Sequence, residues 1–244
     1  MTGSVPKNAM VLAAGLGTRM RPITDRIPKP LVPIAGRTLL DWGLDALAAA
    51  GVEKAVVNVH YLPDQIVAHV ASRTRPRVII SDESAGLLNS AGGIVKALPE
   101  LGPDPFFILN ADTFWIDGGV SNLERLALAW NPAEADILIM LADIESATGH
   151  DGGTDFLLGG HGRLARANGA PEGLIYAGAG IIHPRIFARA AAEPHSLNLY
   201  FDRAIAAGRL FGMAMDGHWI TVGTPAAIPL AEGAVARSQR QKAP

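Results

Sequence analysis

Short, almost continuously apolar runs alternate with helix-like segments through the first 110 residues of this 244-residue chain. Apolar runs of this kind are typical of strands buried on both faces, and the segments between them have the spacing of amphipathic helices. The alternation predicts an α/β fold with a mostly parallel sheet and helices on both of its faces. The expected strands are residues 9–14, 54–60, 77–81 and 106–110, and the expected helices are residues 38–51, 62–72 and 91–101.

The pattern changes after residue 120. Further strand-like runs are joined there by polar, glycine-rich turns, which predicts a small mixed-strand extension or lid over the open edge of the sheet. The expected strands are residues 135–143, 154–159 and 174–183, and the expected helices are residues 184–192, 198–207 and a last helix from Pro225.

The charge of the chain argues against binding to nucleic acid or to anionic membranes. The net charge is −2 and the isoelectric point is near 6.4, so any phosphate site has to be local. The chain has no cysteine, which excludes disulfides and thiolate metal sites and fits a reducing compartment. No apolar run approaches the length of a membrane span, and the N-terminal residues make a poor signal peptide. We therefore expect a cytoplasmic protein.

The first expected strand runs into a loop that gathers glycines, cations and prolines. Gly15 and Gly17 allow backbone N–H groups to approach a ligand closely. Arg19 offers a planar donor group suited to phosphate, and Lys29 offers a compact charge. The loop matches neither common nucleotide motif, G-x-x-x-x-G-K-[ST] or G-x-G-x-x-G. These residues alone leave two alternatives, a solvated turn with surface cations or an anion-binding loop stiffened by proline.

The same loop resembles the signature of the sugar-1-phosphate nucleotidyltransferases, approximately G-x-G-T-R-[LM]-x-P-x-T followed by P-K-x-L-x-P. The residues in register are Gly15, Gly17, Thr18, Arg19, Met20, Pro22, Thr24, Pro28, Lys29, Leu31 and Pro33. The resemblance implies a Rossmann-like sheet and a loop that, with Ala13 and Ala14, wraps a nucleoside triphosphate. It also implies that Arg19 contacts the departing pyrophosphate and that Lys29 lies near the transferred phosphate.

The resemblance covers about residues 8–232. It implies a single domain, residues 1–244, with a nucleotide-binding half over about 8–120 and a sugar-binding half over about 121–232. A second matching segment resembles the stretch E…L-x-T-[AG]-G, which reads the base in this family. Its matching residues are Glu83, Leu88, Ser90, Ala91 and Gly92, with Ser90 in place of the usual threonine. A helix N-terminus capped by Asn89 or Ser90 explains the same residues and is compatible with ligand binding.

Asp112 follows the apolar run at 106–110 and is expected at the carboxyl edge of the sheet. A carboxylate there suits Mg²⁺, although an aspartate after a strand also serves as a turn former. The family motif L-N-[AG]-D implies that Asp112 binds the metal. A second metal carboxylate is expected in W-x-D-[VI]-G-T, where this chain has Thr221 instead. Because a hydroxyl is a weaker ligand, three alternatives remain: one carboxylate suffices, Thr221 acts through water, or catalysis is impaired.

The resemblance implies that an oxygen of a sugar 1-phosphate attacks the α-phosphorus of the nucleotide and that pyrophosphate leaves. Arg19, Lys29, Asp112 and Mg²⁺ are expected to supply positioning and charge neutralisation, without a catalytic histidine. Segments across the chain are most similar to the N-acetylmuramate 1-phosphate uridylyltransferases of peptidoglycan recycling, which implies UTP and that sugar phosphate as substrates. The residues expected near the sugar are Asn110, Asp155, Gly178 and Ala179.

Three other functions are open at this point. The first is an enzyme resembling the mannose-1-phosphate guanylyltransferases. The second, favoured by Thr221, is a nucleotide- or sugar-binding protein that has lost catalysis. The third, an NAD-dependent oxidoreductase, is less consistent because the glycine spacing is wrong. The sequence does not indicate an oligomeric state.

Overall fold

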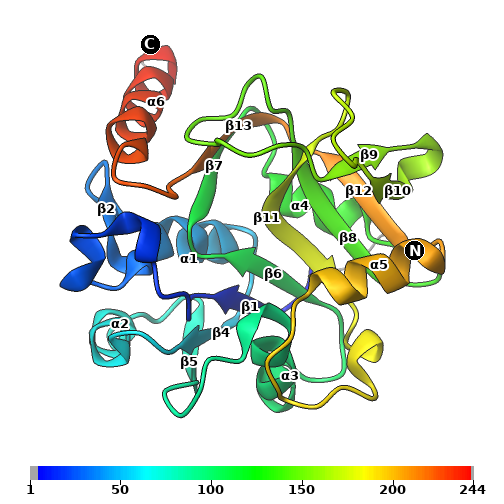
Figure 1. Ribbon diagram of the computed structural model, residues 1–244, viewed down its shortest axis with the longest axis horizontal. Coiled ribbons are helices and arrows are strands. Elements are labelled where there is room, and N and C mark those ends of the chain that lie inside the picture. Colours follow the sequence, from blue (N-terminus) through cyan, green and yellow to red (C-terminus); the bar gives the residue numbers. More distant parts are fainter. Residues whose placement is uncertain (1–4, 243–244) are drawn as a thin grey trace.

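The computed structural model describes residues 5–242, which form one central seven-stranded sheet with helices on both faces (Figure 1). Within this sheet only the strand 175–182 runs antiparallel to its neighbours, so the expected mostly parallel α/β fold is confirmed. In spatial order the strands are β12 (Leu210–Ala214), β8 (Ile137–Ala142), β11 (Ile175–Ile182), β6 (Phe106–Asn110), β1 (Asn8–Leu12), β4 (Lys54–Val59) and β5 (Arg77–Asp82).

Two helical layers explain why the strands are apolar on both faces. On one face pack α1 (Leu39–Ala49), α2 (Pro63–Val70) and α4 (Asn122–Ala129), and on the other pack α3 (Asn89–Leu101) and α5 (Asn198–Ala206). Successive side chains of a strand point to opposite faces. In β1, Ala9 and Val11 therefore enter the first core, and Met10 enters the second.

Smaller elements complete the chain. Three antiparallel pairs join β7 (Thr113–Asp117) to β13 (Gly217–Thr221), β9 (Phe156–Leu158) to β10 (Leu164–Arg166), and β2 (Pro33–Ile34) to β3 (Arg37–Thr38). Short 3-10 helices cover Thr18–Met20, Ile23–Asp25, Lys29–Leu31, Gly160–Gly162 and Pro184–Phe187. A third core joins the opening loop, Phe114, Ile220 and the last helix, α6 (Ala227–Lys242). Among residues 5–242, no helix has both the length and the apolar character to cross a membrane.

The expected elements in both halves are present, with differences at their ends. β1 stops at Leu12 because the N–H of Ala13 donates to the side chain of Asn58 and not to a neighbouring strand. The helix expected at 184–192 is only a short 3-10 helix, since the chain after it turns to pack against α3. β7 was not expected as a separate strand, because only two residues divide its apolar run from that of β6.

The start of α3 is tied to the segment that leads into α5. The N–H of Ala91 donates to the carbonyl of His195 at 3.0 Å, and the N–H of Leu197 donates to the hydroxyl of Ser90 at 2.8 Å. The approach is so close that a Cβ at Gly92 would overlap the carbonyl oxygen of Glu193. Glycine at 92 is therefore required by packing between the two halves of the chain.

We expect Gly92→Ala to lower the free energy of unfolding by about 1–3 kcal/mol, since the added methyl group displaces backbone. Gly86→Ala is the matched control, because a Cβ at Gly86 meets nothing within 4 Å. That variant should stay within about 0.5 kcal/mol of the parent in urea unfolding. Equal stability of both variants would contradict the close approach of residue 193 to α3.

Candidate active site

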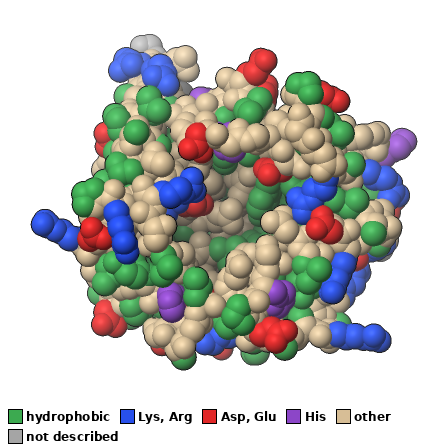
Figure 2. Space-filling view, viewed as in Figure 1, with side chains coloured by type: hydrophobic (Ala, Val, Ile, Leu, Met, Phe, Trp, Pro, Cys, Tyr) green, Lys and Arg blue, Asp and Glu red, His purple; other side chains and the backbone are tan. Residues whose placement is uncertain are grey.

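Two adjoining cavities lie at the carboxyl ends of β1 and β6, where Figure 2 shows the surface hollowed near its centre. The first cavity has a volume of about 280 Å³, and the second of about 240 Å³. Both are lined by Leu12, Ser90 and Asn110, so these three residues form the boundary between them. The carboxyl edge of a parallel sheet is the usual place for a ligand, as the sequence predicted.

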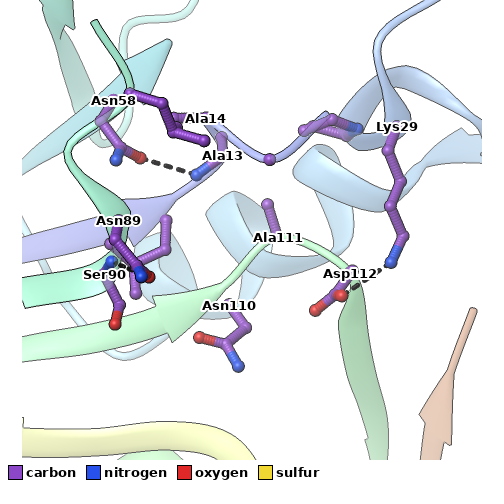
Figure 3. Close-up of a pocket in the computed structure, with 13 residues that line it drawn as sticks. Ala13, Ala14, Lys29, Asn58, Asn89, Ser90, Asn110, Ala111 and Asp112 are labelled. Atoms are coloured by element: carbon purple, nitrogen blue, oxygen red, sulfur yellow. Dashed lines mark hydrogen bonds and ion pairs between the residues drawn. The ribbon is translucent and has the colours of Figure 1, made fainter. Parts of the chain in front are cut away.

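The first cavity has a charged wall on one side. Lys29 and Asp112 form an ion pair on that side (Figure 3), with 2.7 Å between Nζ and Oδ2. The side chain of Lys29 is 12% exposed and that of Asp112 is 39% exposed. The backbone of residues 13–15 also lines the cavity, and a Cβ at Gly15 would meet nothing within 4 Å. The cavity thus combines an open stretch of backbone with a cation and a carboxylate.

The opening loop is held by its own contacts. Gly17 has a φ of 63°, and its carbonyl accepts a hydrogen bond from the hydroxyl of Thr24 at 2.8 Å. A Cβ at Gly17 would come within 3.0 Å of both Lys29 and Thr24, so glycine fixes the path of the chain here. Arg19 lies beside Gly223, and among residues 5–242 its guanidinium has neither a hydrogen bond nor an ion pair. It is therefore free to bind an anion.

A buried polar chain supports the opposite wall. Asn58 accepts a hydrogen bond from the N–H of Ala13 at 2.7 Å and donates one to Glu83 at 2.7 Å. The other carboxylate oxygen of Glu83 accepts from the N–H of Leu88 at 3.0 Å. Glu83 is 1% exposed, so these bonds satisfy a carboxylate that burial would otherwise make costly. The network fixes the start of the opening loop against the segment that leads into α3.

The second cavity is mostly aromatic and polar. It is lined by Leu12, Ser90, Asn110, Asp155, Phe156, Arg166, Tyr176, Ser196, Leu197, Asn198 and Phe201. Asp155 accepts a hydrogen bond from the backbone N–H of Tyr176 at 2.8 Å, and the rings of Phe156 and Tyr176 both meet Phe201 edge to face. This wall offers hydrogen-bonding groups on an apolar base, as sugar sites need.

The hydroxyl of Tyr176 is buried and has no hydrogen-bond partner within the described part of the chain. Burial raises the pKa of this phenol above its ordinary value, and the charges of Asp155 and Asp112 raise it further. The group therefore stays protonated across the physiological range. An unpaired buried hydroxyl costs stability, so its presence beside a cavity is a feature that packing alone does not explain.

Some of the predicted site residues line the two cavities, and the others do not. Lining the first cavity are Ala13, Ala14, Gly15, Lys29, Ser90, Asp112 and Asn110, and Asp155 lines the second together with Ser90 and Asn110. The other predicted residues line neither cavity, namely Gly17, Thr18, Arg19, Met20, Glu83, Leu88, Ala91, Gly92, Gly178, Ala179 and Thr221.

Several of these outer residues have clear structural roles. Met20 is fully buried in the third core, and Ala179 pairs with Leu109 inside the sheet. Gly178, with a φ of 77°, lies against Thr113 and Asn110, since a Cβ there would overlap the Thr113 hydroxyl and come within 3.2 Å of the Asn110 amide. Gly178 thus makes room for a cavity residue that the sequence analysis did identify.

The structure also adds cavity residues that the sequence analysis did not assign to the site. Besides Leu12, Pro30, Leu87, Asn89 and Ala111, the most informative is Asn58. An asparagine inside the apolar run 54–60 was a signal, because a buried amide requires partners. No comparable sequence feature indicated the second-cavity residues Arg166, Asn198 and Phe201, since their neighbours in space are distant in sequence.

The residues around Asp112 suit a single-carboxylate metal site. Oδ2 is paired with Lys29, and Oδ1 has no hydrogen bond or ion pair from any residue in the range 5–242. Thr221 pairs with Thr113 across the β7–β13 ladder, and the N–H of Val222 donates to the carbonyl of Asp112 at 3.1 Å. In the same range there is no group of three or more His, Cys, Asp and Glu side chains that could hold a metal. A nucleotide-bound divalent ion needs fewer, because phosphates and water supply the other ligands.

Asp216 is excluded as a substitute for the missing carboxylate. It precedes β13, and its carboxylate accepts a hydrogen bond from the N–H of Gly119 at 3.1 Å. Thr221, beside Asp112, is the last residue of the same strand, so the two positions are at opposite ends of β13.

Comparison with known proteins agrees with this geometry. The family model of the MobA-like NTP transferase domain matches residues 9–207. This chain belongs to that family. It is 45% identical over 240 residues to the N-acetylmuramate alpha-1-phosphate uridylyltransferase of Caulobacter vibrioides, covering 96% of this chain and 98% of that protein. It is 33% identical to the protein of the same name from Neisseria meningitidis serogroup B, covering 88% and 93%.

More distant matches agree with the family and the fold. A probable mannose-1-phosphate guanylyltransferase 2 of Arabidopsis thaliana is 28% identical, over 89% of this chain and 62% of that protein. The solved inositol-1-phosphate CTP transferase of T. maritima superposes with a TM-score of 0.76 at 18% identity, covering 92% of each chain. The resemblance of the opening loop to the sugar-1-phosphate nucleotidyltransferases is therefore confirmed, and an oxidoreductase is excluded.

We expect Tyr176→Phe to leave the ligand-free protein as stable as the parent, or more stable by about 1 kcal/mol, because it removes an unpaired buried hydroxyl. Tyr200→Phe is the matched control. The hydroxyl of Tyr200 lies 3.0 Å from Nε2 of His195, so its removal should lower the free energy of unfolding by about 1 kcal/mol. Urea unfolding of both variants measures whether the free energy of unfolding falls in Tyr200→Phe and not in Tyr176→Phe. A clear loss of stability in Tyr176→Phe would contradict the unpaired state of that hydroxyl.

Proposed function

We propose that this chain transfers the uridylyl group of UTP to N-acetylmuramate 1-phosphate, which gives a UDP-sugar and pyrophosphate. The observation that carries the proposal is the pair of adjoining cavities, with Lys29 and Asp112 on the wall of the first. Two substrates that react with each other have to be held side by side, and Leu12, Ser90 and Asn110 are the boundary across which they would meet.

The nucleotide belongs in the first cavity. Its triphosphate would follow the open backbone at residues 13–15 toward Lys29, with the unpaired guanidinium of Arg19 next to the departing pyrophosphate. The base would lie toward the segment at 87–90, which carries Leu87 and Asn89 on the cavity wall. This arrangement gives the region 8–120 the nucleotide-binding role and leaves the sugar to the region 121–232.

The reaction needs charge neutralisation more than acid or base catalysis. An anionic oxygen of the sugar phosphate attacks the α-phosphorus, a new P–O bond forms, and the bond to pyrophosphate breaks in line. Lys29 would neutralise charge on the transferred phosphate, and Arg19 would neutralise it on the leaving group. Holding both substrates in this geometry supplies much of the remaining acceleration.

Enzymes of this family generally use a divalent metal, and Mg²⁺ is our proposal here. Asp112 would hold it, with Thr221 close by. When bound, the ion would neutralise phosphate charge and orient the phosphate oxygens. We propose that one carboxylate is sufficient, because Mg²⁺ in nucleotide sites takes its other ligands from phosphate and water.

The choice of base and sugar is supported by the two uridylyltransferases among the relatives, at 45% and 33% identity. The mannose-1-phosphate guanylyltransferases among the relatives are 25–32% identical and are matched over only 61–66% of their length. A protein that only binds nucleotide is less consistent with the site, since Lys29, Arg19 and Asp112 are all present. We further propose a cytoplasmic role in the recycling of peptidoglycan sugars.

A pyrophosphate-release assay with Mg²⁺ tests the proposal. UTP, GTP, dTTP and CTP are each combined with N-acetylmuramate, N-acetylglucosamine, glucose and mannose 1-phosphates. We expect turnover to be greatest for UTP with N-acetylmuramate 1-phosphate. Preference for GTP with mannose 1-phosphate would favour the guanylyltransferase alternative, and nucleotide binding without any turnover would favour the non-catalytic one.

In the same assay Asp112→Asn should lower kcat by at least about 100-fold, as expected for loss of an electrostatic group at the reacting phosphate. Asp216→Asn is its control, because that carboxylate lies at the other end of β13. It should retain activity within about threefold of the parent. Similar activity of the two variants would show that Asp112 does not take part in the reaction.

A further inference from the structure

The second cavity contains one cation, Arg166 at the end of β10, among its lining residues. Its guanidinium lies over the ring of Phe156, with 4.7 Å from Cζ to the ring centroid, and 5.9 Å from that of Phe201. Nε donates to Asp202 at 2.8 Å, and Nη2 donates to the side-chain oxygen of Asn198 at 3.0 Å. The side chain is 28% exposed, so it is held in place at the rim of the cavity and not free in solvent.

These contacts use one edge of the guanidinium and leave donors on the other. Nη1 has no hydrogen-bond partner among residues 5–242. The ion pair with Asp202 does not by itself explain the arrangement, because Asp202 is 61% exposed and such pairs add little stability. An arginine fixed by stacking and by hydrogen bonds, with free donors beside a cavity, is suited to bind a carboxylate or another planar anion.

Two of the candidate sugars differ in one such group. N-acetylmuramate is N-acetylglucosamine with a lactyl ether, and the carboxylate of that ether is negatively charged at neutral pH. The 1-phosphate of either sugar has to lie at the boundary with the first cavity, near Ser90 and Asn110. The rest of the sugar then extends into the second cavity, toward the wall that carries Arg166.

We infer that Arg166 is the specificity-determining residue for the sugar, and that its free Nη1 donors bind the lactyl carboxylate. The inference rests on the proposed function. Asp155, the other charged residue of this cavity, already accepts a hydrogen bond from the backbone of Tyr176. It remains able to accept from neutral sugar hydroxyls, which the two sugars share. Arg166 is therefore the charged residue of this cavity that would distinguish the two sugars, through the lactyl carboxylate.

The test compares two sugars and three variants at saturating UTP. Arg166→Gln, which keeps a planar donor without charge, should lower kcat/KM for N-acetylmuramate 1-phosphate by about 10- to 100-fold, mainly through KM. Its kcat/KM for N-acetylglucosamine 1-phosphate should change by less than about threefold. Arg166→Lys, which keeps the charge but not the planar fork, should lie between the parent and Arg166→Gln for the muramate.

The control is Arg163→Gln in the same hairpin. Arg163 also lies over an aromatic ring, that of Phe211 at 5.2 Å, and donates to a backbone carbonyl, but it does not line the second cavity. This variant should treat both sugars as the parent does. Thermal unfolding and UTP affinity of each variant separate a folding defect from a change in sugar selection.

Equal losses of kcat/KM for both sugars in Arg166→Gln, or no loss for either, would overturn the inference while leaving the proposed function intact. So would a parent protein that uses the two sugars equally well. A parent protein that forms no UDP-sugar from the muramate would remove the proposed function, and the inference with it.

Discussion

The ion pair between Lys29 and Asp112 connects the two segments on which the site depends. Lys29 is at the end of a glycine- and proline-rich loop, and Asp112 follows the central strand β6, yet their charged atoms are 2.7 Å apart. The lysine side of the pair is largely removed from water, so the charge of Lys29 would be costly to keep there without a partner. If a phosphate pairs with Lys29 while a metal ion binds Asp112, both charges remain compensated when the ion pair opens.

The rest of the structure holds these two charges at the edge of a cavity. On one side, Asn58 and Glu83 form a buried network that fixes the start of the opening loop. On the other side, the hydroxyl of Ser90 accepts a hydrogen bond from the N–H of Leu197. This bond ties the start of α3 to the segment that lines the second cavity. These three bonds join residues that are distant in sequence, and the bond between Ser90 and Leu197 joins the two halves of the chain. The positions of the two cavities relative to each other are therefore set by packing between the two halves of the chain.

The sequence predicted the parts of this arrangement that have a local cause. Apolar periodicity predicted the sheet and its helices, and the glycines and cations of the opening loop indicated Gly15 and Lys29. Asp112 was expected at the same sheet edge because it follows an apolar run, and the family resemblance implied that it lies near the same ligand. The sequence could not distinguish residues that line the cavity from residues that support its walls from behind, such as Glu83 and Gly92. It also could not place Arg166, because the stacking on Phe156 and the bonds to Asn198 exist only once β10 and α5 meet.

Direct transfer between the two cavities is the central claim of this account. At their boundary, the hydroxyl of Ser90 accepts a hydrogen bond from Leu197, and no histidine lines either cavity to act as its base. The stereochemistry at phosphorus tests this claim, using a single diastereomer of uridine 5′-(α-thio)triphosphate with N-acetylmuramate 1-phosphate. We predict inversion at the α-phosphorus in the UDP-sugar, as one in-line displacement requires. Retention would mean a covalent nucleotidyl-enzyme and would contradict direct transfer.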